Sequence, residues 1–255
     1  MSGVTAIEKE ADRLASVISD NGYAVLEHYL PAELLDQGRR FIEEQAARAG
    51  GEYFAIHGVE ALAGSTVATL ALSAPLKDLM TALYRAQTGR NPSTTEQVFP
   101  VVRCLQGRSG LKHSHFYHFD ATTFTALLPL FIPTEGEHCG DLILFPNVRR
   151  VGFNALRNVV EKAVMHNTLS QKLVALGVRR GWLKPIRLKL VPGNLYLFSG
   201  YRSLHANDEC DPARLRATAL FHFGNPHHDS ALARMLLGAN KRRAKLDHNG
   251  LRPVN

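Results

Sequence analysis

The chain has 255 residues, of which 45% are apolar and 21% are charged, and this ordinary globular composition excludes disordered and fibrous proteins. The net charge of +7 is unevenly spread, because residues 1–148 hold 11 Lys and Arg against 17 Asp and Glu, whereas residues 149–190 hold 10 against 1. The longest apolar stretch, around residues 125–133, is too short to cross a bilayer, which excludes a transmembrane protein.

The N-terminus and the cysteines predict a cytoplasmic protein. Residues 8–10 read Glu-Lys-Glu where a signal peptide needs an apolar core. Cys104, Cys139 and Cys210 are an odd number and have no C-x-x-C spacing. This pattern disfavours a disulfide framework and a zinc–cysteine site, and it suits a reducing compartment.

The first 95 residues are predicted to be mostly helical. A helix ends at Asn21-Gly22, because apolar residues recur before it at steps of three and four, at Ile7, Ala11, Leu14 and Ile18. A short strand follows at residues 23–26. Pro31 then starts a second helix that runs to Gly50, and a third helix covers residues 75–86.

From residue 96 onward the pattern changes to short strands rich in β-branched, Leu and Phe residues. The expected strands cover residues 98–105, 124–132, 141–145, 186–191, 195–198 and 215–223. Helices first and strands afterwards predict a mainly β, α+β fold, in which an antiparallel barrel or sandwich has helices packed on one face. We expect a single domain over residues 1–255, with the β-rich core at 96–226 and a basic tail at 227–255.

A helical insertion at about residues 152–180 interrupts the strands. Two apolar stripes at helical spacing run through it, one at Leu156, Val160 and Val164 and the other at Leu169, Leu173 and Leu176. Asn167-Thr168 is expected to separate the two helices and to cap the second. This insertion carries five of the ten Lys and Arg residues of segment 149–190.

Alternation assigns two faces to the last strand, 215–223. One face is apolar and suits cover by helices, with Leu215, Ala217, Ala219, Phe221 and Phe223. The other face carries Arg214, Arg216, Thr218, Leu220 and His222. The polar residues on this second face predict that it lines solvent or a site.

A metal site is predicted from His118, Asp120 and His205. His118 and Asp120 are two residues apart, so on a strand their side chains point to the same side. His205 follows a turn, a strand and a second turn that begin at Pro192, and it is the strongest candidate for a third ligand. Two His and one carboxylate are the ligand set of non-heme Fe(II) oxygenases.

Arg216 and Thr218 are candidates for binding an organic acid. Arg216 lies 11 positions after His205, and its guanidinium can bind a carboxylate through two hydrogen bonds. Thr218 is on the same face and can add a third. Arg214 shares this face and is the main rival for the carboxylate, but only Arg216 gives the Arg-x-Thr spacing.

At these residues the sequence resembles the Fe(II)- and 2-oxoglutarate-dependent dioxygenases, especially the small-molecule hydroxylases related to phytanoyl-CoA hydroxylase. The matching pattern is His118-Phe-Asp120, then His205, then Arg216-Ala-Thr218. The resemblance covers roughly residues 20–226 and includes Gly-Asp-Leu-Ile-Leu-Phe-Pro at 140–146, which looks like a barrel strand.

The resemblance implies a double-stranded β-helix, or jelly roll. It implies that His118, Asp120 and His205 bind Fe(II), and that Arg216 and Thr218 hold the distal carboxylate of 2-oxoglutarate. With O2, the cosubstrate is converted to succinate and CO2 while a C–H bond of a small metabolite is hydroxylated. Asp120 argues against the halogenases of this family, which have a small residue there; desaturation and ring closure use the same ligands and stay open.

His113 and His115 suggest an alternative metal site. With Asp120 they resemble the metal motif of cupins, which needs a further His three or four residues after the Pro192-Gly turn. This chain has only Asn and apolar residues there, so a cupin-type metal enzyme is the weaker interpretation. We expect His113 and His115 to be loop residues or substrate contacts.

Other polar residues are given smaller roles. We expect His222, His227 and His228 to lie at the edge of the core or in loops, and not to bind metal. Arg202 and Asn207 flank His205 and are candidates for substrate contacts.

The alternative of another class is a non-enzymatic binding module for an anionic partner. Residues 149–190 and 241–245 supply cations for phosphates, but the only aromatic residues there are Phe153 and Trp182, so nucleic acid is disfavoured. We expect instead that segment 149–190 builds a positively charged lid over the metal. Such a lid would recruit a small-molecule substrate that is anionic or linked to a carrier.

Overall fold

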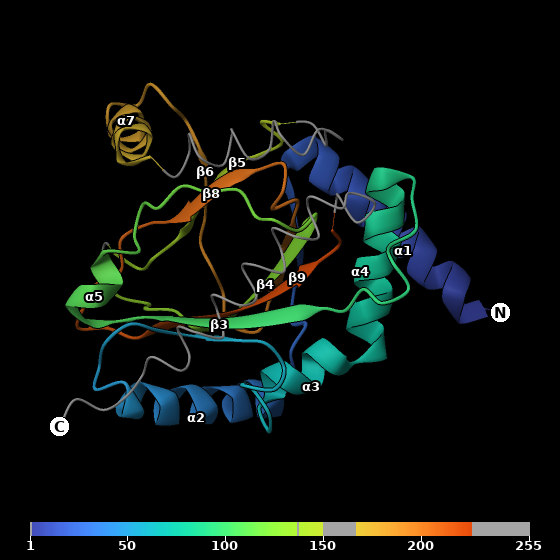
Figure 1. Cartoon of the computed structure of the whole chain (residues 1–255), viewed down its shortest axis with the longest axis horizontal. Coiled ribbons are helices and arrows are strands. Elements are labelled where there is room, and N and C mark those ends of the chain that lie inside the picture. The colour runs from blue at the N-terminus through green and yellow to red at the C-terminus, as the bar shows by residue number, and fades with distance from the viewer. Residues whose placement is uncertain (1, 137, 150–166, 226–255) are drawn as a thin grey trace.

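Two antiparallel β-sheets face each other in the computed structural model, which describes residues 2–136, 138–149 and 167–225 (Figure 1). The larger sheet has six strands in the order β1 (Tyr23–Leu26), β7 (Leu195–Phe198), β4 (Phe124–Phe131), β9 (Arg216–Phe223), β3 (Phe99–Leu105) and β2 (Phe54–His57). The smaller sheet has the order β6 (Ile186–Leu188), β5 (Leu142–Phe145) and β8 (Leu204–Asn207). This is the jelly roll that the resemblance implied, and the predicted α+β class is confirmed.

Helices cover the outer face of the larger sheet. They are α1 (Ser2–Asn21), α2 (Ala32–Arg48), α3 (Thr66–Leu72) and α4 (Ala74–Thr88), and their buried residues form one core cluster with that face of the sheet. The periodicity that predicted α1 is the reason it packs there, because Ala11, Leu14 and Ile18 are all buried. Pro31 is the N-cap residue of α2, so the helix begins one residue after the predicted start, at Ala32.

The alternation predicted for the last strand is confirmed. Ala217, Ala219, Phe221 and Phe223 belong to the helix-facing cluster, and all are buried. Leu220 packs on the opposite side, in a second cluster that joins the two sheets. Arg216, Thr218 and His222 therefore point into the space between the sheets, which we call the lumen.

Four elements were not predicted from the sequence. They are the strands β2 and β8 and the helices α3 and α5 (Gly107–Leu111). All four are short, and each is fixed by a neighbour that is distant in sequence: β8, for example, pairs with β5, so that His205 lies opposite Leu144. His205 thus follows the predicted turn, and the strand that carries it was not predicted.

Helix α7 (Thr168–Arg179) is the described part of the predicted insertion, and residues 150–166 and 226–255 lie outside the described residues. The side chain of Asn167 caps α7 as predicted, by accepting a hydrogen bond from the backbone of Leu169. The stripe that packs is not the predicted one: Val174, Ala175 and Val178 contact the smaller sheet.

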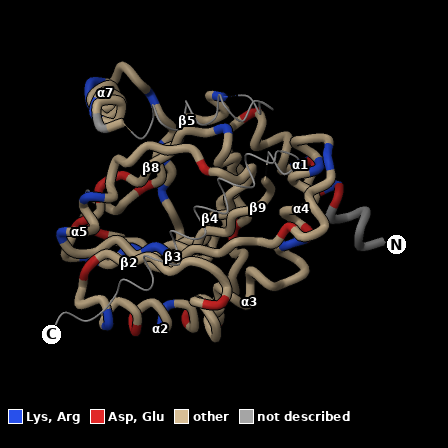
Figure 2. The backbone as a smooth tube through the Cα atoms, in the orientation of Figure 1, with Lys and Arg blue, Asp and Glu red and all other residues tan. Residues whose placement is uncertain are grey.

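The predicted stripe on α7 faces outward, since Leu169 and Leu173 are 64% and 58% exposed. Helix α7 contacts the smaller sheet at Ile143 and Ala206, on the side away from the lumen. Lys and Arg residues are prominent on α7 (Figure 2). The expected charged lid is therefore wrong for this half of the insertion.

Candidate metal centre

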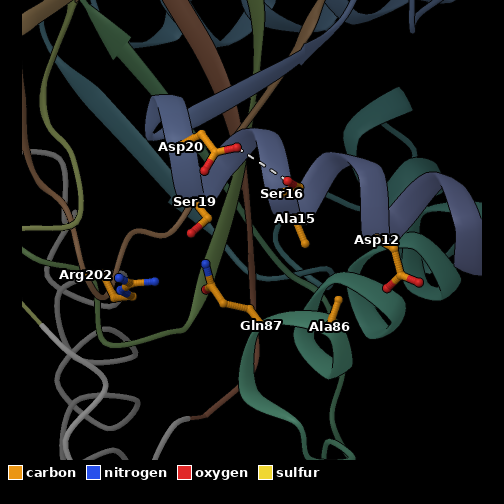
Figure 3. Close-up of a pocket in the computed structure, with 8 residues that line it drawn as sticks. All are labelled: Asp12, Ala15, Ser16, Ser19, Asp20, Ala86, Gln87 and Arg202. Atoms are coloured by element: carbon orange, nitrogen blue, oxygen red, sulfur yellow. Dashed lines mark hydrogen bonds between the residues drawn. The ribbon is translucent and has the colours of Figure 1, made fainter.

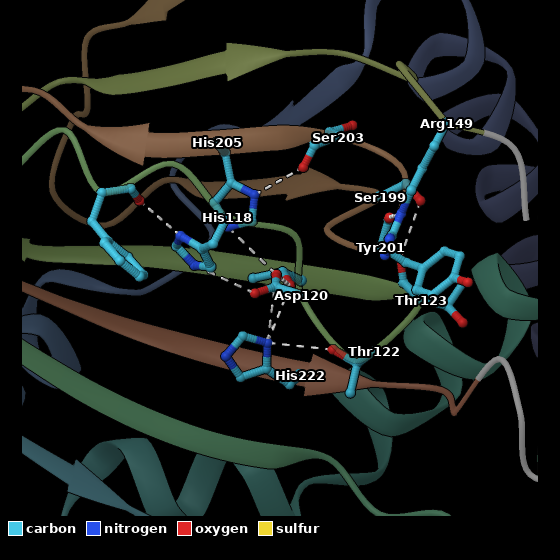
Figure 4. Close-up of polar contacts among 12 residues, drawn as sticks. His118, Asp120, Thr122, Thr123, Arg149, Ser199, Tyr201, Ser203, His205 and His222 are labelled. Carbon is cyan, nitrogen blue, oxygen red and sulfur yellow. Dashed lines mark hydrogen bonds and ion pairs between the residues drawn. The ribbon is translucent and has the colours of Figure 1, made fainter. Parts of the chain in front are cut away.

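Backbone pairing brings His118, Asp120 and His205 together at one end of the lumen (Figure 4). His118 and His205 form an isolated antiparallel bridge, in which each backbone N–H donates to the other carbonyl, at 2.9 and 3.0 Å. The N–H of Asp120 donates to the carbonyl of Gly200, just after β7, at 2.9 Å. Asp120 is outside any strand, so this pairing, and not the expected strand geometry, places its side chain beside His118.

The three side chains form a compact donor set. Asp120 Oδ1 lies 3.7 Å from Nε2 of His118, and Asp120 Oδ2 lies 3.6 Å from Nε2 of His205. One donor atom from each residue falls within 4.8 Å of the other two. In the described part of the chain this is the one His, Cys, Asp and Glu cluster with such spacing.

Hydrogen bonds fix both imidazoles in the form that binds metal. Nδ1 of His118 lies 3.0 Å from the carbonyl of Phe116, and Nδ1 of His205 lies 3.0 Å from the carbonyl of Ser203. A carbonyl can only accept, so each Nδ1 carries a proton, and in the neutral ring the lone pair is then on Nε2. Both lone pairs are on the atoms that face Asp120, as a metal ligand requires.

The protonation states at neutral pH also suit a divalent cation. Burial lowers the pKa of His118 to about 3, so this imidazole is neutral. Burial opposes ionisation of Asp120, but the three imidazoles around it and a hydrogen bond from Thr125 outweigh that effect and lower its pKa. The site thus offers neutral imidazole nitrogen and one carboxylate without first losing a proton.

Two further residues hold Asp120. Thr125, on β4, donates its hydroxyl proton to Asp120 Oδ2, and Nδ1 of His222, on β9, lies 3.1 Å from the same hydroxyl oxygen. The hydroxyl has one proton, so it accepts from His222 while it donates to Asp120. Gly200 leaves the space for this carboxylate, because a Cβ there would lie 2.0 Å from Asp120 Oδ2.

Arg216 is deep in the same lumen, with 1% of its surface exposed. Its Nε donates to the carbonyl of Gly140 at 2.7 Å, and its Nη2 donates to Oδ1 of Asn207 at 3.2 Å. Gly140 has a φ of +73°, and a Cβ there would lie 2.3 Å from Arg216 Cδ, so only glycine fits. Burial and the charge of Arg103 lower the pKa of Arg216 to about 10, and the guanidinium stays charged at neutral pH.

The other residues predicted for an acid site differ in position. Thr218 is buried in the lumen, two residues from Arg216 on β9. Asn207, expected as a substrate contact, instead bonds Arg216. Arg214 is exposed, and its guanidinium lies 3.2 Å from Glu135.

The structure does not assemble the alternative cupin-type site. The ring of His113 stacks on Tyr53, with centroids 3.7 Å apart. Nε2 of His115 lies 3.5 Å from carboxylate oxygens of Asp208 and Glu209. Neither imidazole is in the cluster with Asp120.

Arg202 lines a separate cavity of about 380 Å3 between α1 and α4 (Figure 3). Its other lining residues are Asp12, Ala15, Ser16, Ser19, Asp20, Ala86 and Gln87. None of the three residues of the metal cluster lines this cavity. His227 and His228 lie outside the described residues.

Sequence reasoning missed several neighbours of the cluster. His222 was expected at the edge of the core, although alternation on its strand already placed it on the face of Arg216 and Thr218. Arg149 was assigned only to a basic segment, yet its guanidinium packs 4.2 Å from the Phe119 ring and 3.9 Å from the Tyr201 ring (Figure 4). The pairing that brings these residues to the site is not visible in sequence.

No protein-family model and no curated protein matches this chain. Solved structures do match. A prolyl hydroxylase from Trichoplax adhaerens, in complex with a peptide fragment of hypoxia inducible factor, has a TM-score of 0.56 and 14% identity, over 88% of this chain and 93% of that one. EctD from S. alaskensis with bound Fe has a TM-score of 0.55 and 18% identity, over 83% and 75%.

A prolyl-4-hydroxylase from Pseudomonas putida matches with a TM-score of 0.54 and 12% identity, over 84% of this chain and 98% of that one. At these identities the comparisons establish a shared fold, the jelly roll, and nothing finer. Among the described residues, no helix combines the length and apolar character needed to cross a membrane.

Proposed function

We propose that this chain is an Fe(II)- and 2-oxoglutarate-dependent dioxygenase that hydroxylates a C–H bond of a small metabolite and releases succinate and CO2. The observation that carries the proposal is the donor set of His118, Asp120 and His205. Two imidazoles with free Nε2 lone pairs face one ionised carboxylate, and a buried arginine shares their lumen.

His118, Asp120 and His205 would hold the iron. The donors fit Fe(II), because two His and one carboxylate on one face of an octahedral ion leave three positions for other ligands. When bound, Fe(II) supplies the redox chemistry that couples loss of CO2 from 2-oxoglutarate, with O2, to oxidation of the substrate. The protein keeps His118 neutral and Asp120 charged, and it orients both imidazoles through carbonyls.

Arg216 and Thr218 would bind the distal carboxylate of 2-oxoglutarate. A guanidinium held by Gly140 and Asn207 is already oriented, so little side-chain entropy is lost when a carboxylate binds. Its location away from bulk water strengthens the interaction. The hydroxyl of Thr218 can donate one further hydrogen bond.

For the substrate we propose a small molecule in the cytoplasm, either anionic or linked to a carrier. The positive charge of the lumen supports an anionic substrate, because Arg216 on β9 and Arg103 on β3 both face the lumen. The matching prolyl hydroxylase has a peptide bound, so a peptide side chain is the next class to test.

Release of succinate from 2-oxoglutarate tests the proposal. Asp120→Ala and His205→Ala should each reduce it by at least about 100-fold, since the loss of a metal ligand exceeds the cost of losing an outer partner. His138→Ala and Asp78→Ala are matched controls, because both residues are exposed and outside the cluster. Turnover retained in either ligand variant would refute the iron assignment.

A binding measurement separates an enzyme from a binding module. Under anaerobic conditions, Fe(II) with 2-oxoglutarate should give a weak visible charge-transfer band in the wild-type protein and none in Asp120→Ala. A non-enzymatic anion-binding module would give no band in either protein.

A further inference from the structure

Cys139 and Cys210 lie directly opposite each other, away from the metal ligands. They form an isolated antiparallel bridge between the segment that leads into β5 and the segment that follows β8. The bridge keeps the register in which β5 and β8 pair. Both cysteines are free thiols. Their spacing in the sequence predicted no disulfide, so it is the fold that brings them together.

The hydrogen bonds around the two cysteines identify the type of pair. The N–H groups of Gly140 and Asp211 donate across the bridge, at 2.9 and 3.0 Å, each to the carbonyl of the residue before the opposite cysteine. Cys139 and Cys210 are thus a non-hydrogen-bonded pair, in which Cα atoms are about 4.5 Å apart and side chains share one face. A disulfide needs Cα atoms roughly 4.4 to 6.8 Å apart. The backbone therefore already has the geometry of a disulfide.

Neither thiol has a strong partner that would hold it away from the other. The Sγ of Cys139 donates to the carbonyl of Gly136 at 3.5 Å, and the Sγ of Cys210 donates to the carbonyl of Asp211 at 3.8 Å. A thiol is a weak hydrogen-bond donor, so these contacts cost little to break. Rotation of the two side chains is therefore enough to bring the sulfur atoms together.

The two thiols differ in their access to solvent. Cys139 is half-buried, whereas Cys210 is buried. Burial raises the pKa of the Cys210 thiol, and the nearby charge of Arg216 partly opposes this effect. A dissolved oxidant therefore reaches Cys139 first, and Cys210 is in place to react second.

The segments that carry the two cysteines also hold Arg216. Gly140, next to Cys139, accepts from Nε of Arg216 through its carbonyl, and Asn207, three residues before Cys210, accepts from Nη2. A covalent bond between the cysteines would tie these two acceptors to each other. Oxidation would then restrict the backbone that supports the buried guanidinium.

We propose that Cys139 and Cys210 are a redox modification site, at which peroxide forms a reversible disulfide that stiffens the two segments holding Arg216. The thiolate of Cys139 attacks one peroxide oxygen, the O–O bond breaks, and the hydroxide that leaves takes up the thiol proton as water. The sulfur of Cys210 then attacks the resulting sulfenic acid, the S–O bond breaks, and a second water leaves. Two thiols and one hydrogen peroxide thus give one disulfide and two waters.

This chemistry agrees with the reducing compartment expected from the sequence. Disulfides in such compartments are mostly transient and serve catalysis or redox sensing. A reducing thiol such as glutathione returns the pair to two free thiols by exchange, and is itself oxidised to its disulfide. The reaction needs neither a metal nor 2-oxoglutarate, so its test is independent of the proposed function.

Peptide mapping tests the disulfide. The full chain is treated with hydrogen peroxide, its remaining thiols are blocked by alkylation after denaturation, and it is digested without reduction. Mass spectrometry should find the peptide of Cys139 joined to that of Cys210, with the loss of two hydrogen atoms. Treatment with dithiothreitol before the alkylation should remove this joined species.

Cys139→Ser and Cys210→Ser should each abolish the joined species. Cys139→Ser changes a half-buried position, so it provides the test if Cys210→Ser does not fold. Cys104→Ala is the matched control and should keep the disulfide, because Cys104 lies opposite Phe54 and Ala217 and not opposite a cysteine.

Hydrogen–deuterium exchange tests the stiffening. Amide exchange in segments 138–141 and 207–211 should slow by at least about threefold after oxidation and recover after reduction, since the crosslink suppresses local opening. Three thiols that survive peroxide, a sulfinic acid on Cys139 without a crosslink, or a disulfide between two chains would each overturn the site. A disulfide that leaves amide exchange unchanged would overturn the proposed effect on the segments holding Arg216.

Discussion

Asp120 is held in place by residues outside the His118, Asp120 and His205 cluster. Its carboxylate is buried among three imidazoles, and the hydroxyl of Thr125 is its one neutral donor at hydrogen-bond distance among the described residues. His222 fixes the direction of that hydroxyl by donating to its oxygen. Outer partners of this kind orient the ligand and limit the geometries it can adopt, so Thr125 is a positioning residue for the site.

Thr125→Val should therefore weaken metal binding. Valine has nearly the same shape but leaves Asp120 and His222 without their shared partner, and we expect Mn(II) affinity to fall by about 10- to 100-fold. Thr125→Ser keeps the hydroxyl and should stay close to wild type. Titration with Mn(II), followed by electron paramagnetic resonance, measures both; a valine variant with wild-type affinity would show that Thr125 does not position Asp120.

At the level of elements, α7 supports the segment that carries His118. The side-chain amide of Gln171 accepts from the backbone N–H of Tyr117 at 2.8 Å and donates to its carbonyl at 2.6 Å. Tyr117 is fully buried between α7 and the smaller sheet. Gln171 on α7 therefore binds the backbone of Tyr117, directly beside the backbone bridge between His118 and His205.

Gln171→Ala should loosen this segment. Loss of a hydrogen bond worth about 1–1.5 kcal/mol speeds amide exchange at Tyr117 by roughly 10-fold, which hydrogen–deuterium exchange of a peptide covering 114–120 would detect. Lys172→Ala is the control, because Lys172 is exposed on the same helix. Identical amide exchange in the Gln171 variant and the wild type would mean that α7 does not hold segment 114–120.

Elements with a strong local pattern could be predicted from sequence, and β1 and β7 coincide with their predicted ranges. Residue types and spacing were enough to select His118, Asp120, His205 and Arg216 as candidates, and the structure brings the first three together. Thr125 was not selected, because its contact with Asp120 depends on register: Thr125 lies opposite His222 on the neighbouring strand. Register is set by packing between distant strands and leaves no local signal.

Over the whole molecule, the metal cluster connects the two sheets. His205 is on β8 of the smaller sheet, and His118 pairs with it. Asp120 is attached to the larger sheet through Thr125 on β4 and through the carbonyl of Gly200 after β7. A cation bound by all three residues would therefore add a link between layers that also meet through the apolar contacts of the second core cluster and through the hydrogen bond from Arg216 on β9 to Asn207 on β8.

Metal binding should therefore raise the thermal stability of the whole fold. A ligand that binds only the native state at 100 times its dissociation constant adds about 2.7 kcal/mol, which for a chain of this size corresponds to a rise of about 5 to 10 °C in Tm. Calorimetry of the wild-type protein with and without Mn(II) measures this rise. Asp120→Ala should lose it because the link to the larger sheet is gone, whereas His138→Ala, which removes an exposed imidazole, should keep it. A rise of the same size in Asp120→Ala would place the stabilising metal somewhere other than between the sheets.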